Sequence, residues 1–283
     1  MKFLPSARPS PIAGTWYSAN SKDLANRVDR YLAAAQLPEI SGEVIAVVAP
    51  HAGYFYSGPV AAYAFAAVKG MTPELVAVVS PMHYPYPYPL LTSLHRAYAT
   101  PLGEIPVDVP AVEALDHLLQ ERLGEGLTAV AQDPEHSLEI ELPFLQRALP
   151  EAFTLLPVMV HDQSEATVRA LGETLAQVLL DRNALLVAST DLSHFYPQQT
   201  ADSLDGEMLR RVERFDPQAV LQAEEEGKGF ACGRGALAAV MWAARALGAD
   251  RALILKHATS GEASGDYSQV VGYGAAAFLK TGG

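Results

Sequence analysis

Short apolar runs rich in β-branched residues alternate along this chain with longer segments of helical period. Most of these runs show no alternation of apolar and polar residues, which is typical of strands buried on both faces. The runs that we predict to be strands are Val44–Ala49, Leu75–Val79, Leu155–Val160, Ala184–Ala188, Ala252–Leu255 and Val270–Phe278. Strands that alternate with helices in this way predict an α/β fold, whose largely parallel sheet is covered by helices on both faces.

The segments between the runs place apolar residues three and four positions apart, as helices with one buried face do. They are Ser21–Leu37, Pro59–Val68, Pro110–Leu119, Ser164–Leu180, Ala201–Phe215, Asp216–Glu225 and Gly233–Leu247. We predict that two other segments are loops. Pro81–Pro89 holds four prolines and three tyrosines, and Thr259–Ser268 is small and polar. We expect an aromatic, semi-rigid loop at the first and a mobile lid or linker at the second.

The composition is that of a globular protein. Of the 283 residues, 49% are hydrophobic and 18% are charged, which is far from the balance of disordered chains. Open α/β sheets commonly reach this length as one unit, so we predict a single domain over residues 1–283. The formal net charge of −12 comes without any cluster of Lys and Arg. Nucleic acids and anionic membranes are therefore disfavoured as partners.

Cys232 is the single cysteine, which excludes an intramolecular disulfide bond and favours a reducing compartment. The first residues lack the apolar core of a secretory signal. No stretch approaches the roughly 18 apolar residues of a membrane-spanning helix. We therefore expect a soluble, cytoplasmic protein.

Histidines follow three of the predicted strands. His51 and His83 come just after the first two strands, and Asp191 and His194 follow the strand Ala184–Ala188. Ligands of open α/β sheets bind beyond the carboxyl ends of the strands, where these side chains converge. Imidazole is a common metal ligand and a good acid–base group, so the pattern predicts a metal site or a proton-transfer site. A single histidine is more often a structural residue, and it is the convergence of three that favours a shared site.

Two further residues can reach the same place. Cys232 precedes the helical segment that begins at Gly233, and the positive end of that helix is expected to lower the pKa of the thiol. The alternative is a small buried apolar side chain. His136 lies in a loop, where it can enter the site or bind a backbone carbonyl.

Common catalytic signatures are absent. The sequence contains no phosphate-binding GxxxxGK[ST], no HExxH, no GxSxG and no GxGxxG after a strand. The acidic pairs Glu139/Glu141 and Asp202/Asp205 are expected to lie on solvated helix faces rather than to act as glycosidase carboxylates.

A set of short motifs resembles the Memo-like family in content and order. These motifs include PHAGY followed by YSG at residues 50–58, EHSLE with LPFL at 135–145, STDLSH at 189–194 and Cys232-Gly233. The resemblance covers nearly the whole chain. It implies an α/β/α sandwich around a largely parallel or mixed sheet, similar to the class III extradiol ring-cleaving dioxygenases.

The resemblance also implies roles for the converging residues. His51, His83 and Cys232 match the metal-binding triad of the family, and His136, Asp191 and His194 match its other polar pocket positions. The related dioxygenases carry a glutamate where this family has the cysteine. A thiolate softens the site, so we expect iron or copper, with zinc as a further choice. Tyr84 stands where the family usually has a second histidine, and a phenol is a weaker base.

Three functions follow as hypotheses. The first is a metal-dependent oxidoreductase acting on a phenolic or other oxygen-bearing molecule, with His194 as general base oriented by Asp191. The second is a non-catalytic module that binds a peptide in the same pocket, since animal members are linked to phosphotyrosine recognition and cell motility. The third is a hydrolase with Cys232 as nucleophile. Prokaryotic members are associated with radical-SAM and AMMECR-type proteins, which are candidate pathway partners.

Overall fold

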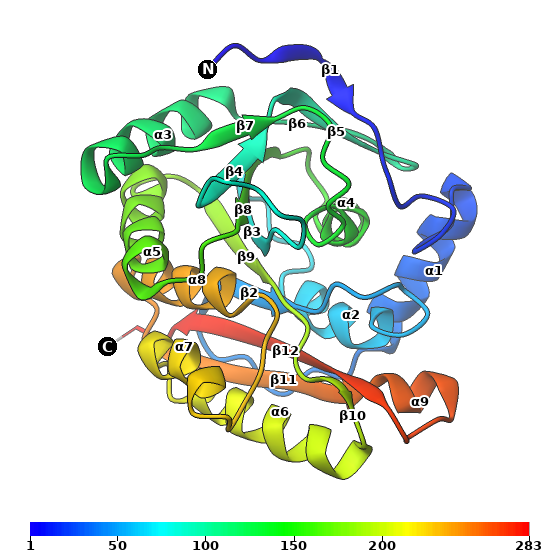
Figure 1. Ribbon diagram of the computed structural model, residues 1–283. Helices are drawn as coiled ribbons and strands as arrows, with labels where there is room; N and C mark the ends of the chain where they lie inside the picture. The colour runs from blue at the N-terminus through cyan, green and yellow to red at the C-terminus, as the bar shows by residue number, and fades with distance from the viewer. Residues whose placement is uncertain (283) are drawn as a thin grey trace.

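The computed structural model describes residues 1–282. Figure 1 shows the helices and strands along the chain. The strands are β1 (Leu4–Arg8), β2 (Glu43–Ala49), β3 (Leu75–Pro81), β4 (Leu90–Ser93), β5 (His95–Thr100), β6 (Gly103–Pro106), β7 (Thr128–Val130), β8 (Thr154–Val160), β9 (Ala184–Ser189), β10 (His194–Tyr196), β11 (Arg251–Thr259) and β12 (Val270–Lys280). The helices are α1 (Ser21–Ala34), α2 (Gly58–Ala67), α3 (Val109–Leu123), the 3-10 turn η1 (Glu139–Glu141), α4 (Leu142–Ala148), α5 (Glu165–Leu179), α6 (Gln198–Glu213), α7 (Pro217–Glu225), α8 (Arg234–Ala246) and α9 (Ser260–Ser264).

A mixed sheet of nine strands forms the centre of the molecule. Its order is β10-β12-β2-β9-β3-β8-β4-β7, with β11 paired to β12. The inner strands β2, β9, β3 and β8 are mutually parallel, whereas β12 joins β2, and β4 joins β8, in antiparallel fashion. A second sheet of three strands has the order β1-β5-β6. The predicted α/β class with a mixed central sheet is confirmed.

Helices cover the central sheet on both faces (Figure 1). On one face α8 packs against β3 and β9, and α5 and α7 pack on α8. On the other face α2 packs against β2 and β12, with α1 and α4 beside it. The apolar sequence of β3 agrees with this position, because all seven of its residues are buried.

Every strand and helix predicted from the alternating pattern is present, with its ends shifted by a few residues. The loop expected at Pro81–Pro89 runs from Met82 to Pro89, because Pro81 still belongs to β3. The segment Thr259–Ser268 contains the short helix α9 rather than loop alone. No helix within residues 1–282 is long and apolar enough to cross a membrane.

The expectation that both acidic pairs lie on solvated faces is wrong for three of the four residues. Glu139, Glu141 and Asp205 are fully buried, and Asp202 alone is exposed. Each buried carboxylate has hydrogen-bond partners from distant parts of the chain. Asp205, for example, accepts a hydrogen bond from the Ser193 backbone N–H, and its Oδ2 lies 2.9 Å from His257 Nε2. A local charge pattern could not reveal these partners.

Candidate metal centre

Three neighbouring parallel strands carry the first residues of the site to one edge of the sheet. His51 lies just beyond β2, Asp191 just beyond β9, and His83 just beyond β3, and these strands are adjacent in the order β2-β9-β3. Because parallel strands end at the same edge, the three side chains are close in space although they are far apart in sequence.

A third histidine completes a compact cluster. His136 comes from the loop that precedes η1, and one ligand atom from each of His51, His83 and His136 lies within 4.8 Å of the other two. The ring centroids of His83 and His136 are 4.9 Å apart, and that of His51 is 5.2 Å from His83 and 5.5 Å from His136. We call this group the histidine cluster.

His51 is buried and held on two sides. Its backbone N–H donates to Asp191 Oδ1 at 2.7 Å, and its ring Nδ1 lies 2.9 Å from Ser189 Oγ. Burial, together with the neighbouring His136 and His83, holds the pKa of His51 well below its usual value. The ring is therefore neutral near pH 7, as a metal ligand must be.

His83 is the most exposed member of the cluster, with 32% of its side chain accessible. Glu135 anchors it: Oε2 accepts the His83 backbone N–H at 2.6 Å, and Oε1 lies 3.0 Å from Nδ1. Burial alone would raise the pKa of Glu135, but hydrogen bonds and charge interactions from His83 lower it well below its usual range. Glu135 is thus an ionised carboxylate inside the protein.

Cys232 adjoins the histidine cluster through His51. Its Sγ lies 3.1 Å from His51 Nε2, and the Asp191 backbone N–H points at the same sulfur from 3.3 Å. The cysteine precedes α8, as the sequence predicts. Burial and the Asp191 carboxylate nevertheless raise the pKa of the thiol, so the lowered pKa expected from the helix N-terminus is wrong. Desolvation outweighs the helix dipole here.

Asp191 and His194 do not form the pair expected between a base and its orienting carboxylate. Within residues 1–282 the Asp191 side chain has no hydrogen bond with His194 and instead holds the His51 backbone. Burial raises the pKa of Asp191 to about 7. His194 opens β10 and packs edge-on against Phe230, with ring centroids 5.4 Å apart. Burial and the nearby His83 lower the pKa of His194.

A buried arginine fixes the loop that carries His136. Arg8, at the end of β1, is 2% exposed and donates to both carboxylate oxygens of Asp133, at 2.6 and 3.0 Å. It also donates to Glu139 Oε2 and to the Glu135 backbone carbonyl, each at 2.6 Å. The strand β1 thereby ties down residues 133–139 from more than a hundred residues away.

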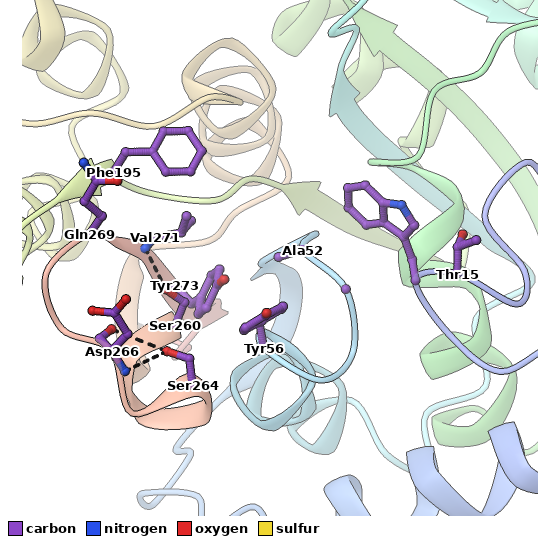
Figure 2. A pocket seen from close by; sticks show the side chains of 12 residues that line it. Thr15, Ala52, Tyr56, Phe195, Ser260, Ser264, Asp266, Gln269, Val271 and Tyr273 are labelled. Atoms are coloured by element: carbon purple, nitrogen blue, oxygen red, sulfur yellow. Dashed lines mark hydrogen bonds between the residues drawn. The ribbon is translucent and has the colours of Figure 1, made fainter.

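A pocket of about 550 Å³ opens beside the histidine cluster. Figure 2 shows Phe195 and Asp266 on one side and Thr15 on the other, with Ala52 and Tyr56 between them. Trp16 also lines the pocket, and its ring packs on His136 with centroids 4.1 Å apart. Ala52 directly follows His51. Two residues that line the pocket are thus neighbours of the cluster, Ala52 of His51 and Trp16 of His136.

A family model described as Memo-like protein matches residues 8–277. The chain belongs to the Memo-like family. It is 37% identical to a MEMO1 family protein of Methanopyrus kandleri, over 96% of this chain and 99% of that protein. It is 35% identical to one of Thermotoga neapolitana, over 94% and 97% of the two chains, and 32% identical to one of Nitrosopumilus maritimus, over 96% and 99%.

The donor set of this Memo-like site fits a transition metal. Imidazole nitrogens and a thiol suit iron, copper and zinc, whereas magnesium and calcium prefer oxygen ligands. Of the residues that the family resemblance assigns to metal, His51 and His83 lie in the histidine cluster, and Cys232 lies beside it. His136, assigned there to the polar pocket, occupies the third place in the cluster.

Sequence reasoning missed the carboxylates and hydroxyls that support this site in the Memo-like chain. Glu135 appears only within the EHSLE motif, and Ser189 appears only as the start of STDLSH. Their presence in family motifs was the only sign that they matter. Their roles could not be predicted, because the residues that they contact are distant in sequence. Arg8 follows the first residues of the chain, and no sequence pattern points to its partners at 133–139.

Proposed function

We propose that this chain is a metal-dependent oxidoreductase. Its centre is the histidine cluster with Cys232 beside it, and its substrate is a small aromatic molecule that bears oxygen, such as a phenol. One observation carries the proposal: one ligand atom from each of three histidines lies within 4.8 Å of the other two. Trp16, whose ring packs on His136, lines the neighbouring pocket. Iron or copper suits this chemistry, and zinc fits the same ligands without redox activity.

The residues around the pocket have separate tasks in this proposal. A bound metal supplies Lewis acidity and, if it is iron or copper, electron transfer. Trp16 and Tyr56 offer aromatic surface against which a ring can pack. His194, whose pKa is lowered, is neutral near pH 7 and can accept the proton of a substrate hydroxyl.

Metal content tests the centre directly. The protein is purified without oxygen and its iron, copper and zinc are measured, for the unaltered chain and for His51→Ala, His83→Ala, His136→Ala and Cys232→Ala. The control is His117→Ala, whose ring lies on α3 with 73% of its side chain exposed. We expect near-stoichiometric metal in the unaltered chain and the control, and at least tenfold less in the His51 and His83 variants. Equal metal in all variants contradicts the proposal.

The metal contents of His136→Ala and Cys232→Ala show which residue is the third ligand. If the three histidines bind the metal, His136→Ala loses it and Cys232→Ala retains part of it. A centre built from His51, His83 and Cys232 shows the opposite order. Turnover is then screened with phenols and oxygen, where His194→Ala should lose activity and keep its metal.

A second candidate function is recognition of a peptide side chain. Two residues that line the pocket are exposed aromatics, Phe195 at 67% and Tyr56 at 43%, and such surfaces commonly contact other molecules. Peptide binding that is unchanged after chelation of metal favours this function over the oxidoreductase.

A further inference from the structure

A neutral imidazole carries one N–H, and only its other nitrogen can bind a metal. Each histidine of a metal centre must therefore hold its proton on the nitrogen that points away from the metal. Groups that accept this proton fix the tautomer and the orientation of the ring. The hydrogen-bond partners of His83 and His51 show where the proton of each ring lies.

For His83 the partner is Glu135. Glu135 Oε2 accepts the backbone N–H of His83, and Oε1 accepts the backbone N–H groups of His136 and Ser137, each at 2.9 Å. Backbone N–H groups only donate, so both carboxylate oxygens act as acceptors. His83 Nδ1, 3.0 Å from Oε1, must then carry a proton, and a ring with this single proton leaves Nε2 free to bind a metal.

For His51 the partner is Ser189, whose hydroxyl has a single proton. Ser189 Oγ lies 2.6 Å from the Ser137 carbonyl oxygen, 2.6 Å from Glu141 Oε1 and 2.9 Å from His51 Nδ1. The Ser137 carbonyl can only accept, so the hydroxyl proton is directed to that carbonyl or to Glu141. His51 Nδ1 must then donate to Ser189 Oγ. His51 Nε2 then carries no proton, and it can accept the thiol hydrogen of Cys232, whose Sγ lies 3.1 Å away.

Each of the three contacts of Ser189 Oγ has one donor and one acceptor if Glu141 is a neutral carboxyl group. The hydroxyl then donates to Ser137 and accepts from both His51 and Glu141, which satisfies all three contacts. Glu141 is fully buried, and its Oε2 has no hydrogen-bond partner within residues 1–282. An ionised carboxylate in this place would leave an uncompensated charge inside the protein.

We propose that Glu135 and Ser189 are positioning residues that hold His83 and His51 in the Nδ1–H tautomer, with both Nε2 atoms free toward a common centre. The segment Glu135–Glu141 supplies this arrangement, through Glu135 for His83 and through Ser137 and Glu141 for Ser189. The inference rests on the proposed metal function for its purpose. The tautomers themselves are present with or without a metal.

The test reads the tautomers directly. Histidine ring nitrogens labelled with ¹⁵N report by NMR which nitrogen carries the proton, and His83→Ala and His51→Ala assign the signals. In metal-free unaltered protein we expect Nδ1–H at both rings. Glu135→Gln should change the tautomer of His83 alone, because an amide cannot accept from all four N–H groups, and Ser189→Ala should change that of His51 alone.

Zinc affinity gives the second readout. Competition with a chromophoric chelator measures the Kd for Zn²⁺, and each variant should bind about 10- to 100-fold more weakly than the unaltered chain. The matched control is Glu139→Gln, which alters a buried glutamate of the same segment that contacts Arg8, Ser10 and Tyr17 but neither histidine. This control should lose stability and keep both tautomers and the Zn²⁺ affinity.

The outcomes separate the inference from the proposed function. Tautomers that stay Nδ1–H in Glu135→Gln and Ser189→Ala overturn the inference, as does an equal loss of Zn²⁺ affinity in Glu139→Gln. If the unaltered chain binds none of zinc, iron or copper, the proposed function fails, while the NMR result still decides whether Glu135 and Ser189 fix the rings. Thermal unfolding of each variant confirms that the changes arise in folded protein.

Discussion

His136 lies where a protonated ring is disfavoured. Burial lowers its pKa to about 4, with Glu135 opposing and His83 reinforcing the shift. The unfolded chain keeps a histidine pKa near 6.5, so between about pH 6.5 and 4 the unfolded state binds more protons than the folded state. The contribution of His136 to the free energy of unfolding must therefore fall as the pH is lowered through this window.

Urea unfolding of His136→Phe, compared with the unaltered chain in chelator-containing buffer, measures this contribution. The difference between the two proteins should change by roughly 3 kcal/mol from pH 7 to pH 4, in the direction that favours the variant in acid. Asp191, whose pKa is raised to about 7, titrates in both proteins and cancels in the difference. A difference that does not vary with pH contradicts the assigned shift.

Arg8 is buried together with two carboxylates, so the loss of its side chain should cost substantial stability. Arg8→Met leaves Asp133 and Glu139 buried without their cation, and breaking a buried ion pair in this way costs about 3–5 kcal/mol. Urea unfolding measures the loss. The control is Arg147→Met, which breaks an exposed pair with Asp29 and should cost about 1 kcal/mol or less. Similar losses in the two variants would contradict the role given to Arg8.

The residues of the site differed in how well the sequence predicted them. His51, His83 and Asp191 follow buried strands, so their convergence could be predicted from the strand pattern alone. Glu139 and Glu141 could not be placed in the same way. These two acidic residues flank one apolar residue, a pattern that is typical of a solvated helix face. They are buried because Arg8 lies against Glu139 and Ser189 lies against Glu141, and both partners are distant in sequence.

At the scale of elements, the strands that could be predicted from the sequence are those buried on both faces. Strands β2, β3, β8 and β9 are continuous apolar runs because both of their faces are covered. The short strands β4, β5, β6, β7 and β10 have three to six residues each, and their sequences carry no such run. Their pairing depends on partners from elsewhere in the chain, which a local pattern does not contain.

The contact between α5 and α8 depends on a glycine. A Cβ atom at Gly172 would lie 2.6 Å from the Ala239 carbonyl oxygen and 2.7 Å from Trp242 Cβ, so the two helices approach too closely for a side chain. Gly172→Ala should therefore destabilise the protein by about 1–3 kcal/mol in urea unfolding.

Gly206, within α6, is the matched control for this contact. A Cβ atom at Gly206 meets nothing within 4 Å, so Gly206→Ala should stabilise the protein by about 0.5–1 kcal/mol through the higher helix propensity of alanine. Equal changes in the free energy of unfolding at the two glycines would show that the close contact between α5 and α8 does not determine the effect of Gly172→Ala.

At the scale of the whole molecule, the proposed centre joins residues from both halves of the chain. A metal that binds only the folded state stabilises it by about 2.7 kcal/mol when its free concentration is 100-fold above the Kd. We therefore expect Zn²⁺ to raise the Tm of metal-free protein by several degrees in calorimetry. The double variant His51→Ala/His83→Ala should show no rise, and an equal rise in both proteins would indicate binding elsewhere.

The antiparallel strand β12 also has a consequence for the order of events during protein synthesis. It pairs with β2, β10 and β11, so β10 and β11 have no partner, and β2 has only β9, until residues 270–280 are available. Val271 and Tyr273 of the same strand line the pocket. A ribosome must therefore have translated nearly the whole printed sequence before the pocket exists. Until then, the growing chain exposes an unpaired edge of β2, which is the kind of surface that chaperones protect.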